Sequence, residues 1–158
     1  MNPNHKMLLH HRCEALFEAK QYELAVKTAS PENLAHNIFH QLLKIRNLRP
    51  KQGELQQRLL ELKSAHNSGP WQSAFTGGLI EFASFVASKK DTSDLDTWNS
   101  AMRELFEGLE EFAMLLRLFD VLTRVKVLND RKALLELPRE QRLLLISENE
   151  AEAVVVSK

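Results

Sequence analysis

The residue pair whose spacing best suits chemistry is His36 and His40. Four residues separate them, so on a helix both imidazoles lie on one face and can bind one transition metal. No third ligand follows nearby, since the sequence has no carboxylate between Asn33 and Gly53. Two-residue motifs often arise by chance, so we interpret the pair as surface histidines, keep metal binding as the alternative, and expect no cofactor.

The one concentration of basic residues lies between positions 44 and 63. Arg58 and Lys63 extend a denser group that could contact phosphates or an acidic partner: Lys44, Arg46, Arg49 and Lys51. Neutralised phosphates supply most non-specific affinity for nucleic acid. The chain as a whole has a net charge of zero and no recognition or base-stacking motif accompanies the patch, so nucleic-acid binding is an alternative and not the favoured interpretation.

Two further features could mark a small-molecule or enzymatic site. Asp120 interrupts an apolar stretch, and Arg117 and Arg124 lie three and four residues from it, within reach on one helix face. Charged groups are seldom fully buried, which favours a surface ion pair. Gly77 and Gly78 interrupt a helical pattern, which favours a helix break or close packing over a ligand site.

The sequence offers no pairing of a nucleophile with a base. Cys13 follows Arg12, but its apolar neighbours predict a buried structural thiol. Gly77 and Gly78 lack the lysine and hydroxyl partners of a phosphate-binding loop. We therefore predict no catalytic residues and lean against an enzyme.

The elements that would position these residues are helices. Gly and Pro number five each, helix-favouring residues are plentiful, and alternating β-branched runs are nearly absent. No apolar run approaches the roughly 20 residues needed to span a bilayer, and one cysteine cannot form an internal disulfide. The composition predicts an all-α, cytoplasmic protein that does not bind membranes.

The most regular apolar pattern lies within residues 93–128. Apolar residues recur there at steps of three and four, and the part from Phe112 to Leu122 is apolar nearly all round. We expect an all-α bundle, or stacked helical hairpins, of about six or seven helices around this long central helix. One straight helix would measure about 50 Å, against a diameter of about 39 Å for a compact chain of this length. Either the helix breaks, with Gly108 as the best position, or the bundle is elongated.

The first half of this stretch has more polar neighbours than the second. We therefore predict that the second half is buried core and that the first half offers a partner-binding stripe: Leu95, Trp98, Met102 and Leu105.

The domain prediction is a single helical domain over residues 1–148, with a tail at 149–158 that frays. Residues 1–66 carry ten basic against six acidic residues, and the loop at 67–70 separates this basic half from an acidic half at 71–148. About 65 residues would make a marginal core alone, which argues against two domains. The charge asymmetry allows head-to-tail self-association, although intramolecular pairing is favoured.

Two local patterns place the first helices. In Ser30-Pro31-Glu32, a capping residue, a proline at the first helical position and an acidic residue mark a helix start. The segment from Ala15 to Val26 is similar to the turn region of a tetratricopeptide repeat, where an aromatic opens the second helix and a small residue permits close packing. The likeness covers less than one repeat and implies a packed helix pair.

These observations favour a non-enzymatic, helical protein–protein interaction module, such as an adaptor, a chaperone-like protein or a regulatory subunit. Its partner would be another protein or a second copy of the chain. Nucleic-acid association through residues 44–63 is the first alternative, and a small-molecule or enzymatic site near Gly77, Gly78 and Asp120 is the second.

Overall fold

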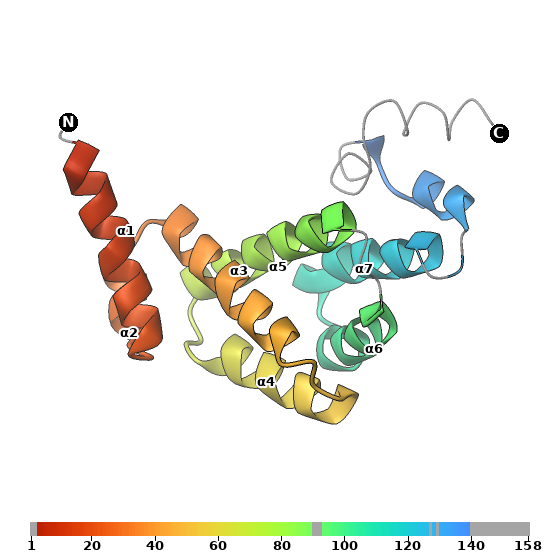
Figure 1. The fold of residues 1–158 in the computed structure, drawn as a ribbon, viewed down its shortest axis with the longest axis horizontal. Coiled ribbons are helices and arrows are strands. Elements are labelled where there is room, and N and C mark those ends of the chain that lie inside the picture. Colours follow the sequence, from red (N-terminus) through yellow and green to blue (C-terminus); the bar gives the residue numbers. More distant parts are fainter. Residues whose placement is uncertain (1–2, 90–92, 127, 129, 140–158) are drawn as a thin grey trace. The chain divides into compact units, whose positions relative to one another are not determined.

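The fold is all-α, as predicted. A computed structural model describes residues 3–89, 93–126, 128 and 130–139, and this part contains no strand. The number of α-helices agrees with the expected six or seven. Figure 1 shows the elements in chain order: α1 (Pro3–Glu18), α2 (Tyr22–Thr28), α3 (Pro31–Asn47), α4 (Gln52–Ser64), α5 (Gly69–Lys89), α6 (Leu95–Phe106), α7 (Ala113–Lys126), and the 3-10 helices η1 (Glu110–Phe112) and η2 (Arg131–Glu136).

The described residues group into two compact units. Unit 1 consists of residues 3–48 and 58–81, and unit 2 of residues 49–57 and 82–139. One boundary lies between α3 and α4 and the other two fall inside α4 and α5, so the loop at 67–70 lies within unit 1 and the charge halves do not coincide with the units. That residues 1–148 form one domain stays a prediction, and the tail at 149–158 lies outside the described residues.

In unit 1, α1 and α2 form the helix pair implied by the repeat-like segment. Tyr22 is the first residue of α2, and Ala25 is fully buried, as close helix packing requires. The start signal of α3 is also confirmed, because the Ser30 hydroxyl accepts a hydrogen bond from the Asn33 amide at 3.2 Å and Pro31 is the first helical residue. Both α2 and α3 lie against α1 (Figure 1).

Close helix packing explains the glycine pair. The helix α5 runs through Gly77 and Gly78 without a break. A Cβ atom at Gly78 would lie 2.8 Å from the Ile38 side chain and 2.9 Å from the Ala35 carbonyl oxygen, both on α3. The space beside Gly78 is therefore filled by α3, and the predicted alternative of a ligand site there is wrong.

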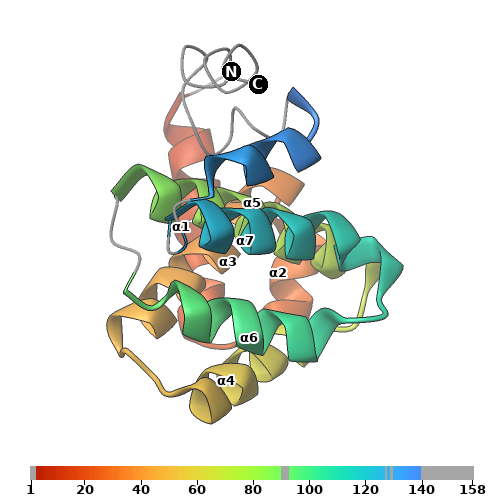
Figure 2. The ribbon, with the colours of Figure 1, turned by 90° about the vertical axis from the view of Figure 1, so that its right-hand side faces the viewer.

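In unit 2, the expected helix at 93–128 is broken. The chain turns at Gly108, whose φ of +84° lies in the left-handed region that glycine adopts readily. The helices α6 and α7 then run side by side in opposite directions (Figure 2). Of the two alternatives that the length argument left, the structure shows the break, so the single central helix is wrong.

Both halves of this hairpin are buried. The second half supplies core residues as predicted, including Phe112, Leu115, Phe119 and Leu122. The first half does so too, because the exposed fractions are 1% for Leu95, 2% for Trp98 and 0% for Met102, and Leu105 is half-buried. The Trp98 ring lies 4.6 Å from that of Phe82. The expectation of an exposed partner-binding stripe is therefore wrong: its apolar side chains form the core of unit 2.

Candidate functional site

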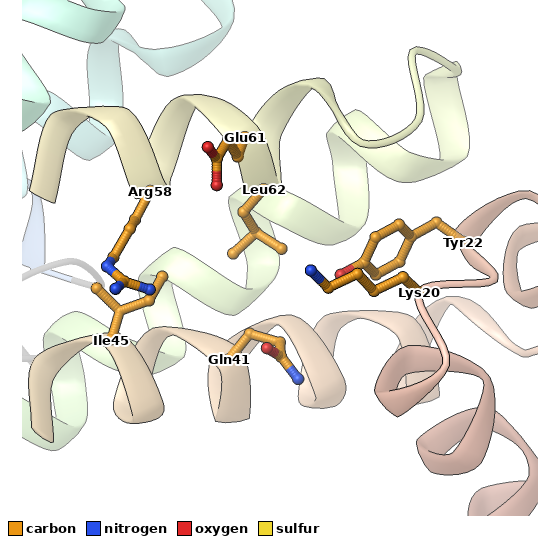
Figure 3. A pocket seen from close by; sticks show the side chains of 7 residues that line it. All are labelled: Lys20, Tyr22, Gln41, Ile45, Arg58, Glu61 and Leu62. Carbon is orange, nitrogen blue, oxygen red and sulfur yellow. The ribbon is translucent and has the colours of Figure 1, made fainter. Parts of the chain in front are cut away.

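A pocket in unit 1 is the best candidate for a functional site. It has a volume of about 410 Å³, within the range of small-ligand pockets. In Figure 3, Lys20 and Tyr22 point into it from one end, and Arg58 and Ile45 lie at the other. The turn after α1, the start of α2, and helices α3 and α4 supply its lining: Lys20, Tyr22, Gln41, Ile45, Arg58, Glu61 and Leu62.

Lys20 stands where the chain leaves α1, in a backbone conformation that lysine seldom adopts. Its φ is +58°, in the left-handed region. Its amide donates to the Phe17 carbonyl oxygen at 3.0 Å, and the Gln21 amide donates to that of Leu16 at 2.8 Å. These two bonds form a Schellman motif, whose left-handed position glycine normally occupies. A non-glycine residue there costs roughly 1–2 kcal/mol.

Tyr22 forms an aromatic wall of the pocket. Its ring packs edge-on against Phe17 at 5.4 Å and lies 5.0 Å from the ring of Trp71. Trp71 is fully buried, and its indole N–H donates to the Leu62 carbonyl oxygen at 3.2 Å. Burial, and then the nearby Glu18 carboxylate, raise the pKa of Tyr22, so its hydroxyl is protonated at neutral pH. These contacts fix the wall in place.

The rest of the lining combines apolar surface with charge. Ile45 and Leu62 are largely buried and supply apolar contact area. Two cations, Lys20 and Arg58, stand against one carboxylate, Glu61, so the formal lining charge is +1. The lining contains no histidine, cysteine or serine. Such a pocket can bind an anionic group by charge and hydrogen bonds.

The predicted basic residues differ in their partners and exposure. Lys44 forms an ion pair with Glu18 of α1, which neutralises its charge. Arg46 is half-buried, whereas Arg49 and Lys51 are exposed. Lys44 and Arg46 belong to unit 1, and Arg49 and Lys51 to unit 2. Contact of these residues with phosphates or an acidic partner stays a prediction.

The predicted histidine pair does come together. The Nε2 atoms of His36 and His40 are 3.0 Å apart on α3. The ring of His10 on α1 lies 5.7 Å from that of His36, a contact that the sequence did not indicate. Burial, and then the neighbouring His36, lower the pKa of His40. Among the described residues, no group of three or more His, Cys, Asp or Glu side chains is arranged to surround a metal ion.

Asp120 takes part in a partly exposed ion-pair network in unit 2. Its carboxylate contacts Arg124 at 3.6 Å, as predicted, and its second partner is Arg103 of α6 at 3.0 Å in place of Arg117. The Asp120 side chain is 37% exposed, in agreement with the favoured surface interpretation.

Cys13 is a buried structural thiol, as predicted. Only 1% of the residue is exposed, and the Asn37 side-chain amide donates to its Sγ at 3.3 Å. Burial raises its pKa to about 11, which leaves the unreactive thiol form at neutral pH.

Sequence reasoning missed the pocket itself. Its seven lining residues come from three helices and a turn, so helical spacing connects the members within α3 and within α4 but not the three helices with one another. Two signals were present: the repeat-like turn places Tyr22 at the start of a helix, and Arg58 belongs to the basic stretch at 44–63.

Within the described residues, no helix has the length and apolarity that crossing a membrane requires. Comparisons of the chain with protein-family models, curated proteins and solved structures find no match.

Proposed function

We propose that this protein is a non-enzymatic, helical protein–protein interaction module, such as an adaptor or regulatory subunit. Its unit 1 pocket receives an acidic side chain from a partner protein. The size of the pocket, its apolar contact area and its excess of positive charge support this function. A partner segment that ends in a carboxylate would place the charge near Lys20 and its apolar neighbours against Ile45 and Leu62.

The observation that carries the proposal is the left-handed Lys20. Glycine would complete the same helix end without strain, but it would leave this end of the pocket without its ammonium group. Among the described residues, Lys20 has no ion-pair partner. A strained residue that presents an uncompensated charge to a pocket is typical of a binding site.

A binding measurement with a simple acidic probe tests the pocket. Fluorescein-labelled hexaglutamate is titrated with the protein at low salt, with hexaglutamine as the uncharged comparison, and fluorescence anisotropy is recorded. K20Q should weaken hexaglutamate binding about tenfold, the effect of losing one hydrogen bond to a charged group. K20R keeps the charge and should stay within about threefold of the wild type.

Lys27 provides the matched control. It is an exposed lysine on α2, outside the pocket lining, so K27Q removes the same charge from the same region. Equal loss of binding in K20Q and K27Q would mean that general charge and not the pocket attracts the probe. That result, or no preference for hexaglutamate over hexaglutamine, would contradict the proposed site.

The partner class needs a second experiment. A native pull-down compares the wild type, K20Q and K27Q, each with and without nuclease, and identifies retained proteins by mass spectrometry. The proposal predicts a partner protein that is still retained after nuclease treatment. K27Q should retain this partner as the wild type does, and K20Q should not. Loss of every specific protein after nuclease treatment would favour nucleic-acid association instead.

A further inference from the structure

The histidine pair on α3 carries an inference that is independent of the pocket. His36 and His40 lie one helical turn apart in unit 1, and both reach solvent, with 40% of the His36 side chain exposed. Phe39, 8% exposed, lies beside both rings, at 6.1 Å from His36 and 5.5 Å from His40. A buried aromatic therefore lies beside two partly exposed imidazoles whose Nε2 atoms face each other.

The geometry of the pair resembles that of a chelate. The two Nε2 atoms are 3.0 Å apart, the ring centroids are 4.4 Å apart, and the planes meet at 88°. Two imidazoles pointing at each other along one line would, at this nitrogen separation, have ring centroids farther apart than the observed 4.4 Å. The shorter observed distance shows that the two rings approach each other at an angle. Metal–nitrogen bonds of about 2.0–2.1 Å that meet at a right angle place the two nitrogens about 3 Å apart.

A carboxylate on α5 lies at the other nitrogen of His36. Oε1 of Glu81 is 3.6 Å from Nδ1. A metal-bound histidine commonly directs its second ring nitrogen toward a carboxylate, which fixes the tautomer and leaves Nε2 for the ion. At 3.6 Å the Glu81 carboxylate attracts an Nδ1–H electrostatically but does not form a hydrogen bond with it.

We propose that His36 and His40 chelate one divalent transition-metal ion through their Nε2 atoms, with Cu²⁺ or Ni²⁺ as the best match. Imidazole ligands at right angles suit the tetragonal geometry of these ions, whereas tetrahedral zinc separates its ligands more widely. Because the described residues include no third protein ligand arranged around this point, water or a group from a partner completes the coordination.

Metal titration of protein prepared without a polyhistidine tag tests this site. Cu²⁺ binding is followed by isothermal titration calorimetry at neutral pH, and the copper-loaded protein is examined by electron paramagnetic resonance. We expect one ion per chain and hyperfine coupling to two nitrogens. H36Q and H40Q should each lower the affinity for Cu²⁺ at least about tenfold. Each should also remove the hyperfine coupling to one of the two nitrogens.

His66 supplies the control, because H66Q removes a histidine that lies outside this pair. It should bind Cu²⁺ with the wild-type affinity, and circular dichroism should show unchanged helix content in all three variants. The proposal is overturned if H36Q and H40Q bind within about threefold of the wild type, or if the spectrum shows fewer than two coupled nitrogens.

Discussion

Two cations, Arg124 in unit 2 and Lys20 in unit 1, have contrasting surroundings. In unit 2, the Arg124 guanidinium contacts three carboxylates, those of Asp120 at 3.6 Å, Asp130 at 3.5 Å and Glu136 at 2.5 Å. Arg103 holds the same Asp120 at 3.0 Å. In unit 1, Lys20 points into a pocket and has no carboxylate partner among the described residues. Arg124 therefore joins elements of its own unit, as the Lys44–Glu18 pair does in unit 1, whereas Lys20 faces the pocket without a carboxylate partner in the described part of the chain.

Both units contain a non-glycine residue at a positive φ: Lys20 at +58° in unit 1 and Arg49 at +47° in unit 2. Unit 2 turns at Gly108, a residue that takes a positive φ without strain. Unit 1 ends α1 with Lys20 at a positive φ, where glycine would be more stable. Backbone strain is therefore present in both units, and what distinguishes Lys20 from Arg49 is that Lys20 lines the candidate pocket.

The largest expected effect tests whether the stripe in unit 2 is truly closed core. W98A should lower the free energy of unfolding by about 3–5 kcal/mol, since it empties a fully packed position. Urea denaturation monitored by circular dichroism measures the change. Leu128 is 68% exposed, so L128A should stay within about 0.5 kcal/mol of the wild type. A loss below about 1 kcal/mol for W98A would restore the stripe as an open surface.

The next prediction concerns the close contact of α3 and α5 in unit 1. G78A should lower the free energy of unfolding by about 1–3 kcal/mol, because its Cβ would overlap the Ala35 carbonyl oxygen and the Ile38 side chain. At Gly77 the nearest atom would lie 3.4 Å away, so G77A should leave stability unchanged or raise it by up to about 1 kcal/mol. If G78A and G77A are equally stable in the same urea assay, α3 and α5 are not in close contact at Gly78.

A smaller effect of opposite sign tests the strain at Lys20. K20G should raise the free energy of unfolding by up to about 1 kcal/mol, because glycine removes the left-handed strain. K20A loses the same charge but keeps the strain, so it should match the wild type within about 0.5 kcal/mol. If K20G is no more stable than K20A in urea denaturation, the left-handed conformation of Lys20 carries no strain.

The smallest effect concerns the acid response of unit 2. The hydrogen bond from Arg124 holds the pKa of Glu136 below its ordinary value of 4.5. The stabilisation is therefore complete above pH 4.5 and disappears as the pH falls through the lower, folded-state pKa. Between pH 7 and pH 3, the Tm of the wild type should fall more than that of E136Q. E23Q, which changes an exposed carboxylate of unit 1, should follow the wild type. If Tm falls equally with pH in the wild type and in E136Q, the ion pair of Arg124 and Glu136 does not contribute to stability.

Local patterns in the sequence predicted the secondary structure well. The cap at Ser30 and the repeat-like turn before Tyr22 depend on neighbouring residues, so the local sequence contains the information. The break at Gly108 was one of two alternatives and was argued from the length of the expected helix. The all-α class follows from the composition for the same reason.

Burial and the candidate site depended on distant residues. Trp98 was predicted to be exposed because its neighbours in sequence are polar, yet Phe82, sixteen residues earlier, lies against its ring. The partner Arg103 of Asp120 comes from another helix, and the pocket joins the end of α1 with α2, α3 and α4. Helical periodicity shows which residues share a face, but it does not show what packs on that face.

The placement of the aromatic residues gives each unit its own optical reporter. The chain has two tryptophans, and both are buried: Trp71 stacks on Phe17 in unit 1, and Trp98 lies against Phe82 in unit 2. W71F and W98F therefore each leave one indole whose fluorescence follows a single unit. Recorded during unfolding, the two signals show whether a disturbance at the pocket stays in unit 1 or passes to the hairpin of α6 and α7.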